Sequence, residues 1–133
     1  MSARDARRRD LVKCEDMRLY AERAQQFLAA RSRKDFLADA MLQDAVVRCV
    51  EVIGEAARLV SDDTRRRAPE IPWPLITGMR HVLAHDYGTV DLEKVYEVVR
   101  VELPNLLAHL AALIAALEED VGWEADEDRD PMS

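Results

Sequence analysis

Apolar residues recur through most of this chain at alternating spacings of three and four positions, which is the period of a helix that buries one face. Such stripes predict one helix over residues 9–30 and a second over residues 32–61. Ser32 and Asp35 are spaced as in the capping box that begins a helix. The next segment, residues 61–72, is polar and holds two prolines, so it predicts a connector with one short helical turn.

Two further helices are predicted in the second half of the chain. Pro74 suits the first turn of a third helix, because the N–H group that proline lacks is unpaired there, and Gly88 is a natural end for that helix. Asp91 predicts the N-cap of a fourth helix, whose apolar stripe extends to Leu117. Pro104 lies within that stripe and predicts a kink or a break. The pattern therefore predicts an all-α fold, an antiparallel bundle of four to five helices.

The composition agrees with one helical domain and removes some classes of function. The 133 residues include only 4 glycines, which are too scattered for the loops that cradle phosphates in nucleotide-binding proteins. Residues 118–133 hold eight acids and one base, so they carry the whole formal net charge of −7. We expect residues 1–120 to form the helical domain and residues 121–133 to be a disordered acidic tail.

The two cysteines indicate a reducing compartment. Cys14 and Cys49 both fall within apolar stripes, and no signal peptide is recognisable. We therefore expect two reduced core residues in a cytoplasmic protein. The longest apolar stretch, residues 106–117, has only twelve residues and contains His109, so it is too short to span a bilayer, and no membrane association is expected.

Metal and nucleophile motifs are poorly represented in this sequence. His81 and His85 would share one face of an unbroken helix, but the residue after His81 is valine, so the HExxH zinc motif is absent. No serine lies in a recognisable nucleophile elbow. We expect neither a metal nor another cofactor.

Arg80 and His85 form an Arg-x4-His pair that has a chemical meaning. A histidine that titrates near neutral pH can accept the proton of a ribose 2′-hydroxyl or donate one to the leaving 5′-oxygen, and an arginine can hold the scissile phosphate. The spacing alone is not specific, because a chain of this composition contains about 0.4 such pairs by chance. The two side chains would also lie roughly 140° apart on an ideal helix, so they converge only if the helix is distorted or a second chain completes the site.

Longer runs of residues carry a resemblance to a known family. They are residues 42–48, 52–57, 68–73, 78–80 and 83–87, which read LQDAVVR, VIGEAA, APEIPW, GMR and LAHDY. In this order they are similar to the HepT-type toxins of the HEPN superfamily.

The resemblance implies a fold, an activity and a partner. It implies an α-helical homodimer, which in some relatives assembles further. It implies a metal-independent ribonuclease whose paired Arg-x4-His motifs face a cleft at the dimer interface. It also implies the toxin of a two-gene toxin–antitoxin system, in which an MNT-type nucleotidyltransferase transfers AMP to the tyrosine of Arg-x4-His-x-Tyr and silences the toxin.

The motif positions in this sequence are Arg80, His85 and Tyr87. The resemblance implies that Arg80 and His85 are catalytic and that Tyr87 receives the AMP. His81 stands where the family often has asparagine, and it can still donate a hydrogen bond to a phosphate. Asp86 can orient His85 or cap a helix. Structural alternatives stay open, because Arg80 can form a salt bridge, His85 can close a helix and Tyr87 can pack at an interface.

Two functions are therefore compatible with the sequence. The first is a ribonuclease toxin that acts on RNA and is neutralised by the MNT-type partner. The second is a noncatalytic HEPN-like module that binds a nucleotide, an RNA or a partner protein. Substitution of His85 separates the two, since only the first function requires its imidazole.

Overall fold

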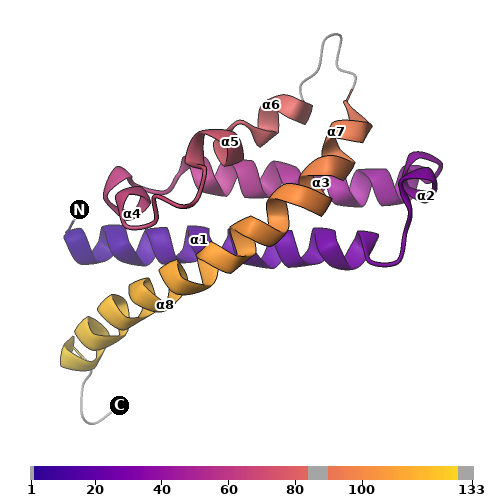
Figure 1. The fold of residues 1–133 in the computed structure, drawn as a ribbon. Helices are drawn as coiled ribbons and strands as arrows, with labels where there is room; N and C mark the ends of the chain where they lie inside the picture. The colour runs from indigo at the N-terminus through magenta and orange to yellow at the C-terminus, as the bar shows by residue number, and fades with distance from the viewer. Residues whose placement is uncertain (1, 84–89, 129–133) are drawn as a thin grey trace.

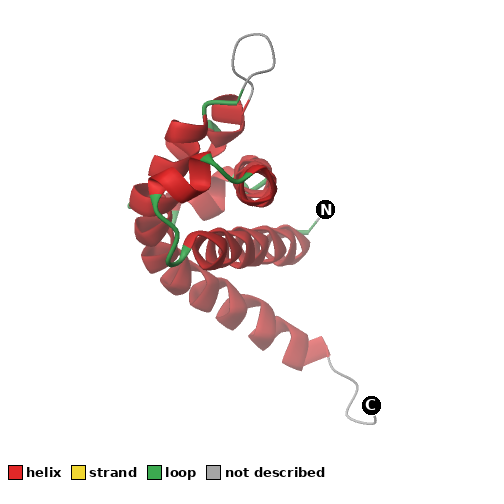
Figure 2. Cartoon of the chain, turned by 90° about the vertical axis from the view of Figure 1, so that its right-hand side faces the viewer, coloured by secondary structure: helices red, strands yellow, loops and turns green. Residues whose placement is uncertain are grey.

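The computed structural model describes residues 2–83 and 90–128, and every regular element in them is helical (Figure 1, Figure 2). Three helices are long: α1 (Ala3–Leu28), α3 (Ala40–Arg58) and α8 (Leu103–Asp128). The shorter elements are α2 (Arg33–Leu37), α4 (Asp62–Arg66), α5 (Trp73–Thr77), α6 (Met79–Leu83), α7 (Leu92–Glu97) and the π-helical turn η2 (Val98–Glu102). The predicted all-α fold is confirmed, whereas the homodimer stays a prediction.

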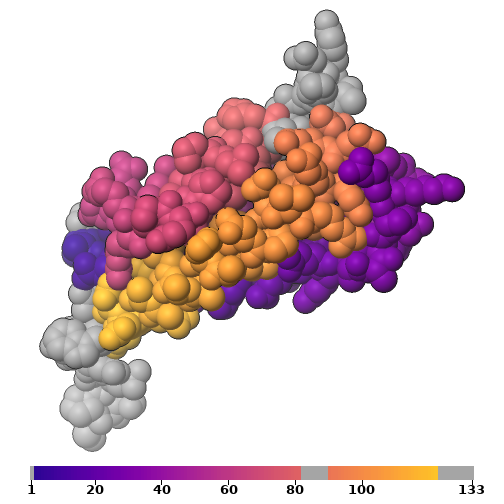
Figure 3. Space-filling model, viewed as in Figure 1, coloured from indigo at the N-terminus to yellow at the C-terminus, as the bar shows by residue number. Residues whose placement is uncertain are grey.

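The core is centred on α1, which packs against both of the other long helices. α3 runs antiparallel beside α1, and α8 crosses α1 diagonally (Figure 1). In the space-filling view α8 forms a diagonal band across the molecule (Figure 3). The buried side chains confirm the predicted stripes: Cys14, Met17, Ala21, Ala24 and Leu28 in α1, Leu42, Val46, Cys49, Ile53 and Ala57 in α3, and Leu103, Leu106, Leu110, Leu113 and Leu117 in α8.

A buried carboxylate joins α1 to α4. Asp10 is 2% exposed, and its oxygens accept hydrogen bonds from the Ser61 N–H at 3.0 Å, the Ser61 hydroxyl at 2.5 Å and the Thr64 hydroxyl at 2.5 Å. Ser61 is also the N-cap of α4. Because these donors converge on one buried acceptor, the connector between α3 and α5 is fixed to the bundle through α1.

The second predicted helix is wrong in its extent, because the structure divides it into α2 and α3. The predicted capping box is present at the start of α2, where the Ser32 and Asp35 side chains each accept a backbone N–H of the other residue. A second cap begins α3, since the Asp39 carboxylate accepts the Leu42 N–H at 3.1 Å. Asp39 also accepts a hydrogen bond from Arg31 at 2.7 Å. This second cap is the reason for the division.

Two other helix limits differ from the prediction. α1 begins at Ala3 rather than near residue 9, because the Ser2 hydroxyl accepts a backbone N–H of the first turn. The third predicted helix is divided at Gly78 into α5 and α6, although Pro74 does lie in the first turn of α5 as expected. The predicted end of that helix falls within residues 84–89, outside the described residues.

The predicted kink before Pro104 takes the form of a π-helical turn. Asp91 caps α7 as expected, and the helix then passes through η2, in which the Leu103 N–H donates to the Val98 carbonyl five residues earlier. Pro104 has no N–H for the carbonyl of Arg100, and its ring would crowd that carbonyl in a regular α-helix. The wider π-helical turn relieves this crowding and keeps the chain helical from α7 into α8.

The Arg100 side chain of η2 closes the end of α1. Its guanidinium donates to the carbonyl oxygens of Leu28 at 3.0 Å, Ala29 at 3.4 Å and Arg31 at 2.5 Å. The last carbonyls of a helix have no partner inside the helix, so a cation there is favourable. η2 therefore connects the second half of the bundle to α1 by charge as well as by apolar contact.

The C-terminal part of the chain differs from the expected disordered tail in the residues that the structure describes. α8 continues to Asp128, so much of the segment expected to be a disordered acidic tail is helical. Residues 121–128 contain no proline and several good helix formers, which favours this extension. On length and composition alone, the longer continuous helix Leu92–Gly122 is apolar enough to cross a membrane. A core helix of a bundle meets the same criterion, and the apolar stripe of α8 is buried in the core beside α1.

Replacing Asp10 with alanine should lower the free energy of unfolding by about 3 kcal/mol, because three donors lose their buried acceptor. Asp63→Ala is the matched control, since Asp63 lies exposed on α4 and should change stability by less than about 0.5 kcal/mol. Urea unfolding followed by far-UV circular dichroism measures both. Equal midpoints for the two variants would show that Asp10 does not secure the connector.

Candidate functional site

Arg80 stands at the start of α6 and forms an ion pair with α3. Its Nη1 donates to Glu55 Oε2 at 3.2 Å, and 41% of the Arg80 side chain is exposed. α6 packs directly on α3, so the pair joins neighbouring elements that are 25 residues apart in the sequence. The predicted phosphate-binding arginine is thus on the surface with its guanidinium directed by a carboxylate.

Glu55 is shared between two arginines. Arg58, one turn further along α3, donates to both carboxylate oxygens, at 2.6 Å from Nη2 and 3.2 Å from Nε. The hydrogen bonds and charge of Arg58, and after them the hydrogen bond from Arg80, hold the pKa of the Glu55 carboxyl below its ordinary value. Glu55 is therefore ionised at neutral pH, and this Arg58–Glu55–Arg80 cluster has two positive charges and one negative charge.

Gly54 allows α6 to approach α3 this closely. A Cβ atom at position 54 would lie 3.2 Å from the Arg80 nitrogen and 3.4 Å from the Ile76 carbonyl oxygen. The first distance is tighter than most Cβ contacts and the second is at the edge of ordinary van der Waals contact, so a side chain here would require the α6 backbone to shift by a few tenths of an ångström. The adjacent pair Gly54 and Glu55 therefore sets both the distance of the Arg80 backbone from α3 and the direction of its side chain.

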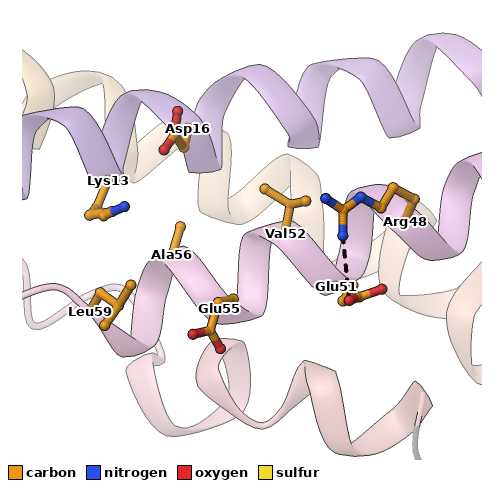
Figure 4. Close-up of a pocket in the computed structure, with 8 residues that line it drawn as sticks. All are labelled: Lys13, Asp16, Arg48, Glu51, Val52, Glu55, Ala56 and Leu59. Carbon is orange, nitrogen blue, oxygen red and sulfur yellow. Dashed lines mark hydrogen bonds and ion pairs between the residues drawn. The ribbon is translucent and has the colours of Figure 1, made fainter.

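A shallow groove between α1 and α3 borders the cluster. Figure 4 shows it, with Glu55 at its edge and pointing away from α1. Charged side chains of both signs and a few apolar ones line it: Lys13, Asp16, Arg48, Glu51, Val52, Glu55, Ala56 and Leu59. The mixed lining gives the groove no net cationic character, so the arginines of the cluster are the better anion-binding groups at this edge.

The structure places two of the five predicted site residues. Arg80 has the position just described, and His81 is exposed beside it, with its N–H bonded to the Gly78 carbonyl at 2.9 Å. His85, Asp86 and Tyr87 fall within residues 84–89, outside the described part of the chain. Their roles therefore stay predictions.

The cysteines confirm their expected place in the core. Cys14 and Cys49 are buried and free. Burial, with a smaller contribution from the charges of Asp10 and Glu15, raises the pKa of the Cys14 thiol to about 12, and burial also raises the pKa of Cys49. Thiols in this state are poor nucleophiles at neutral pH. In residues 2–83 and 90–128, no three histidine, cysteine or acidic side chains gather as a metal site.

Sequence reasoning missed the chemical importance of residues 54–58. Residues 54–57, GEAA, entered only as part of a family likeness, and Arg58 was not singled out at all. A glycine within an amphipathic helix, followed at once by a glutamate and then by an arginine at i+3, was the available signal. It did not reveal which helix approaches Gly54, because that contact is between segments distant in the sequence.

Comparison with known proteins gives one consistent result. A family model described as "Ribonuclease HepT-like" matches residues 17–113. A protein of Thermococcus cleftensis named "Probable ribonuclease HepT" is 37% identical over 92 residues, which are 69% of this chain and 84% of that protein. A "Putative RNase" of Methanocaldococcus jannaschii is 37% identical over 86 residues, which are 65% of this chain and 74% of that protein. No solved structure matches the chain significantly.

Replacing Gly54 with alanine should destabilise the protein by about 1–3 kcal/mol, because the added methyl group meets the α6 backbone. Gly122→Ala is the matched control, since a Cβ at that position meets nothing within 4 Å. This second change should stabilise α8 by about 0.5–1 kcal/mol, the usual gain for alanine over glycine in a helix. Thermal unfolding of both variants measures the difference, and a Gly54→Ala variant as stable as the wild type would contradict the close approach.

Proposed function

This chain belongs to the HepT-like ribonuclease family, and we propose that it is a metal-independent endoribonuclease that acts as the toxin of a cytoplasmic toxin–antitoxin pair. The observation that supports this most is the position of Arg80. In a chain that matches the family over most of its length, the arginine that begins the Arg-x4-His motif is exposed, charged and held in one direction by Glu55. RNA is the substrate class that this family membership favours.

Arg80 binds the scissile phosphate in the proposed reaction. A guanidinium presents parallel N–H donors to two phosphate oxygens, and it stays charged at any physiological pH. The same contact stabilises the extra negative charge that develops on the phosphorus oxygens in the transition state. His81, the next residue, lies exposed and adds a hydrogen-bond donor to the backbone of the RNA.

His85 moves the protons in the proposed reaction. It accepts the proton of the ribose 2′-hydroxyl, whose oxygen then attacks the neighbouring phosphorus. The bond from phosphorus to the 5′-oxygen breaks, and the leaving oxygen takes up a proton. The products are a 2′,3′-cyclic phosphate and a free 5′-hydroxyl, and no metal ion enters the reaction. Asp86 orients the imidazole.

The family resemblance supports two further parts of the proposal. Two copies of the chain form a homodimer, so that both Arg-x4-His motifs face one cleft; closed twofold dimers are the commonest assembly for a chain of this kind. The antitoxin is an MNT-type nucleotidyltransferase that attaches AMP to Tyr87. A phosphodiester charge and an adenosine placed two residues from His85 would repel and obstruct an RNA phosphate.

We expect the purified protein to cleave total cellular RNA in the presence of EDTA and to leave 2′,3′-cyclic phosphate ends. His85→Ala should reduce the cleavage rate at least about 100-fold, because a general acid–base catalyst typically contributes 10²–10⁴-fold. His109→Ala is the control, since His109 lies on α8 and should be silent. Gel analysis of the RNA, with chemical mapping of the new ends, measures the outcome. Cleavage that survives His85→Ala would contradict the catalytic assignment, and binding without cleavage by the wild type would favour the noncatalytic module.

Incubation with the cognate nucleotidyltransferase and ATP should add AMP to the protein. The expected mass gain is about 329 Da per AMP, with loss of RNA cleavage, because the modification adds charge and bulk beside His85. Intact-protein mass spectrometry measures the gain. Tyr96→Phe is the control and should still gain AMP, because Tyr96 is half-buried between arginine side chains near α2 and is not the expected acceptor. A gain that persists in Tyr87→Phe would contradict Tyr87 as the acceptor.

A further inference from the structure

Glu55 places a negative charge beside the arginine that holds the RNA phosphate in the proposed function. Its Oε2 is 3.2 Å from Arg80 Nη1. A carboxylate this close to the guanidinium repels a phosphate that binds the same group, so it weakens RNA binding in the ground state. Removal of this carboxylate would raise the affinity for RNA, so we ask what else Glu55 contributes.

The geometry of the cluster leaves part of the Arg80 fork available. The ion pair with Glu55 uses Nη1, and a phosphate needs two neighbouring donors, which Nη2 and Nε supply. Arg58 contacts both oxygens of Glu55, at 2.6 and 3.2 Å, so it fixes the direction of the carboxylate and offsets its charge. The Arg58–Glu55–Arg80 cluster thus keeps a net positive charge and one arginine whose direction is set.

We infer that Glu55 is a positioning residue for Arg80: held by Arg58, it fixes the guanidinium so that the remaining donors meet the scissile phosphate. The inference rests on the proposed function, because only a phosphate on Arg80 gives this orientation a purpose. Gly54 belongs to the same arrangement, since the close approach at its Cα brings the Arg80 backbone to α3.

Positioning has a kinetic signature that a purely structural salt bridge lacks. Both side chains are well exposed, at 41% for Arg80 and 46% for Glu55, and pairs of this kind add little to stability. An arginine without a partner samples many rotamers, and these must be reduced to one when the transition state forms. Loss of Glu55 should therefore lower kcat. KM should not rise, since a negative charge beside the RNA is removed.

α3 carries a matched control for this test. Arg48 and Glu51 form an ion pair at 3.4 Å with the same i,i+3 spacing as the pair of Glu55 and Arg58. Glu51 lies one turn before Glu55 on the same helix, its side chain is also exposed, and its described ion pair is made within α3. Glu51→Gln removes the same charge from the same surface without releasing Arg80.

The experiment is steady-state cleavage of a short RNA by the full-length wild type, Glu55→Gln, Glu51→Gln, Arg58→Gln and Arg80→Ala. Glu55→Gln should lower kcat about tenfold with KM equal to or below that of the wild type, and Arg58→Gln, which loosens the carboxylate without removing it, should lower kcat about threefold. Glu51→Gln should leave both constants within about twofold of the wild type. Thermal midpoints of Glu55→Gln and Glu51→Gln should agree, which separates positioning from damage to the fold.

The outcomes distinguish this inference from the function on which it rests. An active wild type, an inactive Arg80→Ala variant and an unchanged kcat for Glu55→Gln and Arg58→Gln would overturn the positioning role and leave the proposed function standing. A lower kcat in Glu51→Gln equal to that in Glu55→Gln would also overturn it, because the effect would then come from surface charge. A wild type without RNA cleavage, or an Arg80→Ala variant as active as the wild type, would overturn the proposed function and the inference together.

Discussion

The packing of α1 between α3 and α8 is the contact on which the rest of the molecule depends. Its buried stripe includes Ala21 and Ala24, whose small side chains allow both neighbours to approach closely. Polar contacts are made at both ends of α1. Near the start of α1, Asp10 accepts three hydrogen bonds from the α4 region, and at its end the backbone carbonyls accept hydrogen bonds from Arg100. The connector around α4, the π-helical turn η2 and the long helices α3 and α8 are therefore all held in place by contacts with α1.

The candidate site depends on α1 indirectly, through α3. Gly54, Glu55 and Arg58 lie on α3, a long helix held along its length by α1, whereas Arg80 lies on the five-residue helix α6. A short helix between a glycine break and residues 84–89 has little stability of its own. The close contact with α3 gives α6 the stability that so short a helix lacks. A catalytic geometry is more precise when a rigid element carries the groups that orient it.

Most of the fold could be predicted from the sequence, because one-sided burial imposes a helical period that is visible in every long helix. The apolar stripes of α1, α3 and α8 and the cap at Asp91 follow from local rules. The break at Asp39 was missed because the spacing of apolar residues continues across it, although the backbone leaves the helical conformation at this cap. Within the site, Arg80 and His81 could be singled out by motif and resemblance. The partnership of Arg80 with Glu55 could not, since it depends on which helix packs at Gly54.

The π-helical turn has a consequence for how the gene can vary. Each hydrogen bond of η2 spans one residue more than an α-helical bond, as seen between Leu103 and Val98. Loss of one codon within Val98–Glu102 would restore an α-helical turn and leave the helix after it in nearly the same orientation, because a π-turn holds one residue more than an α-turn over about the same rotation. The leucines of α8 would still face α1, but the ring of Pro104 would again crowd a carbonyl of the preceding turn. The segment can therefore change its length by one residue at the cost of local backbone strain, while the buried face of α8 is kept.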